Sequence, residues 1–343
     1  MSDIKLLDCT LRDGGYANDW NFSKEQITST ITSLTDAQID YVEMGYLTSI
    51  YARVGGTQFQ SAESASQFIP TDKQQSKFVV MADVSQFDVD TLCHRSESLI
   101  DGIRAVFYKR QIEQALSFCK CVVEKGYDLF IQPMVTMDYS IEEYESLIER
   151  FCNICNPYAV SIVDSFGCLQ PHDVMEYFCA LNDVLDENIK IGFHGHDNML
   201  LSQINIISLL ELANEREVMV DASVNGIGRG AGNPCTELIA QHLNRACSKQ
   251  YNIESLISVM SNVTEPISKI EKWGYDPYFL LTAMRRAHPN FATFLLANHD
   301  VSVNDFKVYL ELIPDEMLSN CTRPYVEELY EQLKLNGRDK NLK

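Results

Sequence analysis

The chain has 343 residues, of which 45% are hydrophobic and 22% are charged, proportions that are ordinary for a soluble globular protein. Its formal net charge is −20, and a surface this acidic repels the phosphates of nucleic acids and of anionic lipids, so we expect neither nucleic acid nor membrane as a partner. An anionic small molecule would need a local cation at its binding site.

Short apolar runs alternate with amphipathic stretches along the first 250 residues. The first run, 4–10, is predicted as a strand, and a helix is expected to begin at Ser23, where Gln26 completes the spacing of a capping box. Seven further runs are predicted as strands: 40–46, 77–84, 101–108, 127–135, 159–167, 189–196 and 218–226. Eight near-continuous apolar strands, most followed by a helical stretch, favour an α/β fold of the (β/α)8 TIM-barrel type. A doubly wound open sheet is the alternative, although it usually contains fewer strands.

The strand signal ends after about residue 250. The region from 251 to 343 is predicted to be helical, with Gly274 and Pro277 marking a break inside it. We therefore predict a TIM-barrel domain over residues 1–250 and a small C-terminal helical extension over residues 251–343. No apolar run is long enough to span a membrane. The N-terminus shows no signal-peptide pattern, so we expect the 11 cysteines to be reduced thiols in a cytoplasmic protein.

Polar residues gather where the predicted strands end, which is the edge of a barrel that carries the binding site. The segment GFHGHDN places His194 and His196 on the same side of a strand. They are either two satisfied core histidines or two ligands of one metal ion, which a carboxylate would complete as a facial set. Asp13 is the best carboxylate, because the glycines of RDGG let the backbone bend beside a metal. Arg12 is the local cation that an anionic substrate would need.

The segment NGIGRGAGNP, residues 225–234, is a glycine-rich loop between the last predicted strand and the next helix. Such a loop can hold phosphate on backbone N–H groups, or its glycines can simply permit a tight turn. Its spacing does not match a P-loop. Among the other histidines, His288 precedes Pro289 and is expected to end a helix, and the rest are expected to be solvated.

Three motifs in this order, DCTLRDGG, GFHGHDN and GIGRGAGN, resemble the pyruvate aldolase/HMG-CoA lyase-like superfamily of metal-dependent barrels, and most of all its 4-hydroxy-2-oxovalerate aldolase branch. The resemblance covers residues 1 to about 250. It implies a metal-dependent aldolase that cleaves or forms a 4-hydroxy-2-oxo acid through a metal-bound pyruvate enolate, with a small 2-oxo acid and an aldehyde as substrates. The implied metal is Mn²⁺, with Mg²⁺, Co²⁺ or Zn²⁺ as alternatives. The implied assemblies are a homo-oligomer or a complex with an aldehyde dehydrogenase.

The resemblance also implies roles for individual residues. The metal ligands would be Asp13, His194, His196 and Asn233. The substrate would contact Arg12, Asp13, Ser165, His194 and Tyr275, with Ser165 at its carboxylate. Arg12 would also be catalytic, because it resembles the arginine that stabilises the enolate.

One position departs from the pattern of the aldolase branch, which has a histidine base three residues after the metal-binding aspartate. Here that position is Tyr16, and tyrosine, with an ordinary pKa of about 10, is a poor base at neutral pH. We keep Tyr16 as a catalytic candidate with three hypotheses open: it is tuned, another group or water serves, or the reaction differs.

Two other functions are weighed against an aldolase. The first is a Claisen-type synthase of the isopropylmalate synthase kind, which joins an acyl-CoA to a 2-oxo acid and usually carries Glu where this sequence has Gly15. The lyase branch, too, fits less well, because its catalytic cysteine is missing from the glycine-rich loop before Cys235. The second is a non-catalytic metal-binding barrel, which has no need for the Arg12–Asp13 pair.

Overall fold

The computed structural model describes residues 4–50, 56–213 and 216–340. Within them, eight parallel strands form a closed barrel: β1 (Ile4–Asp8), β2 (Tyr41–Leu47), β4 (Lys77–Asp83), β5 (Gly102–Phe107), β6 (Asp128–Pro133), β7 (Ala159–Asp164), β8 (Lys190–Gly195) and β9 (Val218–Ala222). Neighbours follow the order β1-β9-β8-β7-β6-β5-β4-β2, and pairing of β1 with β2 closes the ring. The short β3 (Gln58–Phe59) adds to the end of β2. The predicted TIM barrel is confirmed, and each predicted strand overlaps one of the eight.

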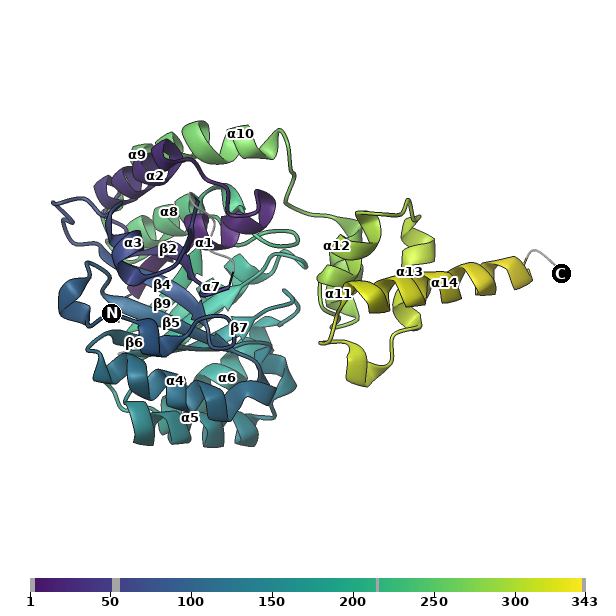
Figure 1. The fold of residues 1–343 in the computed structure, drawn as a ribbon, viewed down its shortest axis with the longest axis horizontal. Coiled ribbons are helices and arrows are strands. Elements are labelled where there is room, and N and C mark those ends of the chain that lie inside the picture. Colours follow the sequence, from purple (N-terminus) through teal and green to yellow (C-terminus); the bar gives the residue numbers. More distant parts are fainter. Residues whose placement is uncertain (1–3, 51–55, 214–215, 341–343) are drawn as a thin grey trace.

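Helices surround the barrel and cover the outward faces of its strands (Figure 1). They are α2 (Lys24–Asp36), α3 (Ala62–Ser66), α4 (Ile112–Glu124), α5 (Ile141–Cys155), α6 (Pro171–Val184), α7 (Ser202–Leu212) and α8 (Thr236–Ala246). The predicted capping box is present at α2, where the Gln26 N–H donates to Ser23 Oγ and the Ser23 N–H donates to Gln26 Oε1. The connection between β4 and β5 differs from the ideal pattern, because it contains two 3-10 turns, Val89–Thr91 and Arg95–Glu97, in place of a helix.

The helical region after residue 250 divides between two hydrophobic cores. The helix α9 (Ile253–Val259), the π-helical turn Met260–Thr264 and α10 (Glu265–Ser268) pack on the barrel, and Leu256, Val263 and their neighbours belong to its core. The boundary between the cores therefore lies beyond the division predicted at residue 250.

A second core joins α11 (Pro277–Met284), α12 (Asn290–Leu296), α13 (Val303–Glu311) and α14 (Arg323–Lys340). These helices form the separate lobe at the yellow end of the chain in Figure 1, which begins at the break predicted at Gly274 and Pro277. None of the described helices is both long and apolar enough to cross a membrane.

The C-terminal lobe touches the barrel at the carboxyl ends of β6 and β7. Ala283, which lies in α11, joins a small apolar cluster with Val135, Phe166 and Cys168. His288, between α11 and α12, packs edge-to-face on Phe166 with 5.3 Å between the ring centroids. The lobe therefore covers part of the rim at which a barrel binds its ligands.

Candidate functional site

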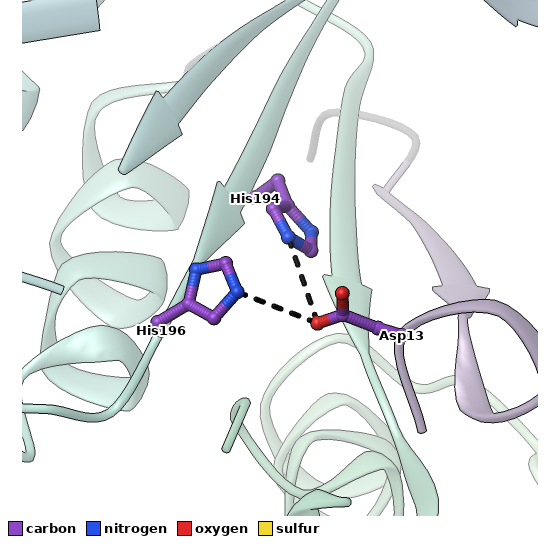
Figure 2. Close-up of side chains that lie close together, drawn as sticks. All are labelled: Asp13, His194 and His196. Atoms are coloured by element: carbon purple, nitrogen blue, oxygen red, sulfur yellow. Dashed lines mark ion pairs between the residues drawn. The ribbon is translucent and has the colours of Figure 1, made fainter. Parts of the chain in front are cut away.

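The three predicted metal ligands meet at the carboxyl ends of β1 and β8. Asp13 is the last residue of α1 (Thr10–Asp13), a single turn after β1, in which Cys9 O accepts hydrogen bonds from the N–H groups of Arg12 and Asp13. Asp13 Oδ2 lies 3.5 Å from His196 Nε2 and 3.9 Å from His194 Nε2 (Figure 2). All three side chains are buried, and one ligand atom from each lies within 4.8 Å of the others.

Both histidines use Nδ1 for a structural hydrogen bond. His194 Nδ1 lies 3.0 Å from Asp221 Oδ2, and His196 Nδ1 lies 3.1 Å from the Asp164 carbonyl oxygen. A carboxylate and a carbonyl accept hydrogen bonds, so each ring carries its proton on Nδ1 and its lone pair on Nε2. Burial, followed by the nearby Arg12 charge, lowers the pKa of His194 although Asp221 opposes this, and that favours the neutral ligand form.

The cluster fits a divalent cation. His196 Nε2 is buried without a hydrogen-bond partner, and its lone pair faces the oxygen of a carboxylate, which offers only lone pairs as well. Facing acceptors of this kind need a positive charge between them. Nitrogen from two histidines and oxygen from one aspartate is a donor set that several divalent metals accept. The metal-ligand interpretation is therefore favoured over two satisfied core histidines.

Asn233 lies beside this set, as predicted for a fourth ligand. Its Nδ2 lies 2.5 Å from Asp13 Oδ2, and its Oδ1 is buried without a partner. A half-turn of the amide group about its last bond would present Oδ1 at the same point. The side chain is thus within reach of a cation held by Asp13.

Arg12 is fixed between two carboxylates. Its Nη1 pairs with Asp13 Oδ1, and its Nε donates to Glu43 Oε2 at 2.7 Å. Because Arg12 takes Oδ1, the other oxygen of Asp13 is left facing the histidines. Burial alone would raise the pKa of Asp13, but the charge of Arg12 opposes it and the pKa lies well below its ordinary value. Asp13 is therefore a carboxylate at neutral pH, as a metal ligand must be.

The buried charges continue through the barrel from Glu43 to His194. Glu43 Oε1 lies 2.9 Å from Arg104 Nη1, Arg104 Nη2 pairs with Asp221 Oδ2, and Asp221 holds His194. Burial tends to raise the pKa of Asp221, but Arg104 and then His194 lower it overall. Charges in a dry interior are tolerated only when they are paired. This chain of ion pairs therefore supports both sides of the candidate metal site.

The same pocket contains six of the predicted site residues: Arg12, Asp13, Tyr16, Ser165, His194 and His196. Ser165 Oγ accepts a hydrogen bond from the Val135 N–H at 2.9 Å, which leaves its O–H to donate. Tyr16 is 41% exposed at the mouth and packs edge-to-face on Trp20 with 4.7 Å between ring centroids. Tyr275 does not line this pocket and is 60% exposed, so the structure does not bring it to the site.

Sequence reasoning does not single out Arg229, which lines the pocket, or His288, which lies near it. Arg229, in the glycine-rich loop after β9, lines the pocket, and its Nη2 donates to the Ser165 carbonyl oxygen at 2.7 Å. The acidic composition could have pointed to Arg229, because a protein with a large negative charge needs a local cation wherever it binds an anion. His288 was expected only to end a helix, but it is 6% exposed, and burial, then Arg229 and His196, lower its pKa to about 3.

Gly15 is held against an aromatic ring. A Cβ atom at this position would lie 2.1 Å from Cδ1 of Trp20, and the Trp20 indole N–H donates to the Arg12 carbonyl oxygen at 2.7 Å. A glutamate at position 15, as the synthase alternative usually carries, has no room while Trp20 stays in place. The local packing therefore disfavours that alternative.

The model of the HMGL-like family matches residues 3–263, well over half of the chain. The chain belongs to the HMGL-like family. Curated relatives include the 4-hydroxy-2-oxovalerate aldolase of Chloroflexus aurantiacus, 26% identical over 277 residues, which cover 78% of this chain and 77% of the relative. The enzyme of the same name from Bacillus cereus is 27% identical over 251 residues, covering 71% of this chain and 70% of the relative. The predicted family and the predicted lyase class are confirmed.

Solved structures are similar in fold to this chain, both over the residues that the family model matches and over the residues after them. The HMG-CoA lyase of Brucella melitensis aligns with a TM-score of 0.64 at 15% identity, over 78% of this chain and all of that one. The carboxyl transferase domain of Rhizobium etli pyruvate carboxylase aligns with a TM-score of 0.70 at 14% identity, over 99% of this chain and 61% of that chain. The second alignment includes the C-terminal helices, so their fold is shared as well.

Proposed function

We propose that this HMGL-like protein is a divalent-metal-dependent pyruvate-type aldolase, which cleaves or forms a 4-hydroxy-2-oxo acid. The observation that carries the proposal is the meeting of Arg12 with the Asp13, His194 and His196 ligand set in one pocket. The names of the curated relatives support the same reaction class. A metal-binding scaffold would need the ligand set but not the arginine.

The residues of the pocket have separate roles toward the 2-oxo acid. Asp13, His194 and His196, with Asn233 within reach, would hold the cation, for which Mn²⁺ is the first candidate and Mg²⁺, Co²⁺ and Zn²⁺ are alternatives. When bound, the cation supplies a Lewis acid for the oxygens of the 2-oxo acid. Arg12 Nη2 is buried without a partner, so it can donate to the oxygen on which the enolate charge develops.

Ser165 and Tyr16 contact the substrates directly. The Ser165 O–H donates to the carboxylate of the 2-oxo acid, because its Oγ already accepts from the backbone. Tyr16 orients the aldehyde by hydrogen bonding, and the proton of the 4-hydroxyl group passes to water or to another group at the rim. A general base of this kind must reach the hydroxyl as the C3–C4 bond breaks.

The test is hydrogen exchange at the methyl group of pyruvate. Protein is treated with a chelator, each of the four metals is added back in D₂O, and deuterium in pyruvate is measured by mass spectrometry. We expect exchange only with metal, and its loss in His196→Ala. Metal binding without exchange would contradict the aldolase and favour the non-catalytic barrel.

Tyr16→Phe tests the role of the tyrosine in the same assay. Exchange should survive in this variant, because Tyr16 serves the aldehyde half, and the parent should cleave 4-hydroxy-2-oxovalerate slowly. Rapid cleavage by the parent that is lost in Tyr16→Phe would show instead that Tyr16 replaces the histidine base.

A further inference from the structure

The pocket contains a second arginine, whose charge no carboxylate balances. Arg229 is half-buried, donates from Nη2 to the Ser165 carbonyl oxygen, and has a buried Nε without a partner. None of the ion pairs among residues 4–50, 56–213 and 216–340 includes it. Arg12, by contrast, pairs with Asp13 and Glu43. An unpartnered guanidinium nitrogen that lines a pocket is a site for an acceptor group from a ligand.

The charges of the pyruvate half are balanced without Arg229. The buried chain contains three carboxylates, on Asp13, Glu43 and Asp221, and two guanidiniums, which leaves one negative charge. A divalent cation turns this into one positive charge, and the carboxylate of a 2-oxo acid neutralises it. The charge of Arg229 lies outside this balance, as does that of Asp164, whose carboxylate accepts from the Cys168 and Leu169 N–H groups and not from Arg229. In a protein of net charge −20, such a cation in a binding pocket is the local positive charge that an anionic ligand would require.

Arg229 lies beside Tyr16, which we assign to the aldehyde, and its Nη2 also reaches the Ser165 carbonyl oxygen. Its guanidinium carbon is 5.5 Å from the centroid of the Tyr16 ring, and Tyr16 is the half-exposed residue at the mouth. The other side chains close enough to influence or be influenced by its charge include Tyr108 and His288. Burial of His288, together with the charges of Arg229 and His196, lowers the pKa of His288 to about 3, so it is neutral and adds no second positive charge beside Arg229.

We propose that Arg229 binds an anionic group, a carboxylate or a phosphate, carried by the aldehyde that this enzyme adds to or releases from pyruvate. The fork of Nε and Nη nitrogens matches the paired oxygens of both groups. This inference rests on the proposed function, because an aldehyde partner presupposes pyruvate enolate formation. It makes the aldehyde half negatively charged, whereas acetaldehyde, the product released from 4-hydroxy-2-oxovalerate, is neutral.

The experiment compares pairs of aldehydes of which one member carries an anionic group and the other does not. Addition of pyruvate to glyceraldehyde 3-phosphate is compared with addition to glyceraldehyde, and addition to succinic semialdehyde with addition to butanal. We expect the parent to prefer at least one anionic partner. Arg229→Gln should lower kcat/KM for that partner by about 10- to 100-fold, the range expected for a charged hydrogen bond, with a much smaller change for its neutral twin. The two pairs distinguish a phosphate from a carboxylate.

Arg110→Gln is the matched control. Arg110 is exposed near the same rim, where its guanidinium stacks 4.5 Å from the Tyr108 ring centroid, but it does not line the pocket. The substitution Arg110→Gln removes the same charge as Arg229→Gln but leaves the contacts inside the pocket intact. An equal loss in Arg110→Gln, or a parent indifferent to charge, would overturn the proposal. A raised KM for pyruvate in the exchange assay of Arg229→Gln would also overturn it, by assigning Arg229 to the pyruvate carboxylate.

A binding measurement separates this proposal from the proposed function. Absence of methyl exchange in the parent refutes the aldolase. Calorimetric titration with glycerol 3-phosphate, succinate and glycerol, in metal-loaded protein, then still tests Arg229. Binding of at least one of the two anions that is lost in Arg229→Gln supports the anion site, and no binding of either to the parent refutes it.

Discussion

Asp221 is predicted to control metal affinity although it is not one of the proposed metal ligands. It is 1% exposed, and a single oxygen, Oδ2, serves both His194 Nδ1 and Arg104 Nη2. Asp221→Asn keeps the size and removes the charge. The one oxygen of the amide then accepts from both donors with less negative charge, and the amide N–H₂ takes the place of Oδ1, which has no hydrogen-bond partner. The ring and the tautomer of His194 are therefore fixed less firmly.

The magnitude follows from what each contact does. Loss of a group that orients a histidine ligand typically weakens metal binding by about 10- to 100-fold, which corresponds to roughly 1.4–2.8 kcal/mol. Stability falls separately, because Arg104 keeps Glu43 but loses a charged partner. Breaking a buried ion pair costs about 3–5 kcal/mol, and the remaining pair with Glu43 places the expected loss near the lower end of that range.

Calorimetric titration with Mn²⁺ measures the affinity, and urea denaturation with chelator measures the stability of the metal-free protein. Asp164→Asn is the control. The Asp164 side chain is buried beside the same site and accepts from the Cys168 and Leu169 N–H groups, but His196 is held by the Asp164 backbone carbonyl. The control should lose stability and keep its Mn²⁺ affinity. An unchanged dissociation constant in Asp221→Asn would refute the orienting role.

Three further predictions address the proposed metal ligands, the proposed catalytic role of Arg12 and the contact of the C-terminal lobe with the barrel. His194→Ala or His196→Ala should abolish tight Mn²⁺ binding in calorimetry while circular dichroism still reports a folded barrel, and parental binding in both would make them structural. Arg12→Lys should reduce turnover by orders of magnitude, because it loses the fixed fork, and should leave Mn²⁺ affinity nearly unchanged; parental turnover would remove Arg12 from the mechanism. The pKa of His288 is lowered to about 3 from about 6.5 in the unfolded chain. At a pH between these two values, the imidazole of His288 therefore binds a proton in the unfolded state but not in the folded state. The free energy of unfolding should therefore fall by up to about 1.4 kcal/mol per pH unit below pH 6.5. Urea denaturation with chelator at pH 7 to 5 should show this loss in the parent and a shallower one in His288→Asn; equal slopes would mean that His288 is not buried as a neutral ring.

The barrel could be predicted because its strands are buried on both faces. Each strand is therefore a run of apolar residues that can be recognised in the sequence without knowing which strands it pairs with. The boundary of the barrel could not be predicted in this way. Helical periodicity continues on both sides of residue 250, and it shows that a helix has an apolar face without showing which core receives that face. Leu256 packs on the barrel and Phe291 in the second core, a difference that only the tertiary packing decides.

The meeting of Asp13, His194 and His196 could be predicted because strand ends in a barrel come together at one rim. Asp221 could not, because in sequence it is a single polar residue in an apolar strand, and its role depends on Arg104, which is far away along the chain. Tyr275 shows the opposite case. Its predicted role rests on the resemblance alone, which covers residues 1 to about 250, and its side chain is 60% exposed and does not line the pocket although the Gly274 N–H donates to the Ala231 carbonyl oxygen.

The buried ion pairs resolve a conflict built into the neighbouring pair Arg12 and Asp13. Asp13 must offer an oxygen to a cation, whereas Arg12, next to it, attracts that carboxylate strongly. The structure divides the oxygens, Oδ1 to Arg12 and Oδ2 to the histidines, and Glu43 holds the Nε of Arg12 from another strand. Without Glu43, Arg12 would be free to turn both η nitrogens toward Asp13 and compete with the cation for it. Because Glu43 also binds Arg104, and Arg104 binds Asp221, the position of the donor Nη2 and the orientation of His194 are set by one set of contacts. The two halves of the proposed chemistry, charge on the enolate oxygen and affinity for the metal, should therefore change together when any member of the chain is replaced.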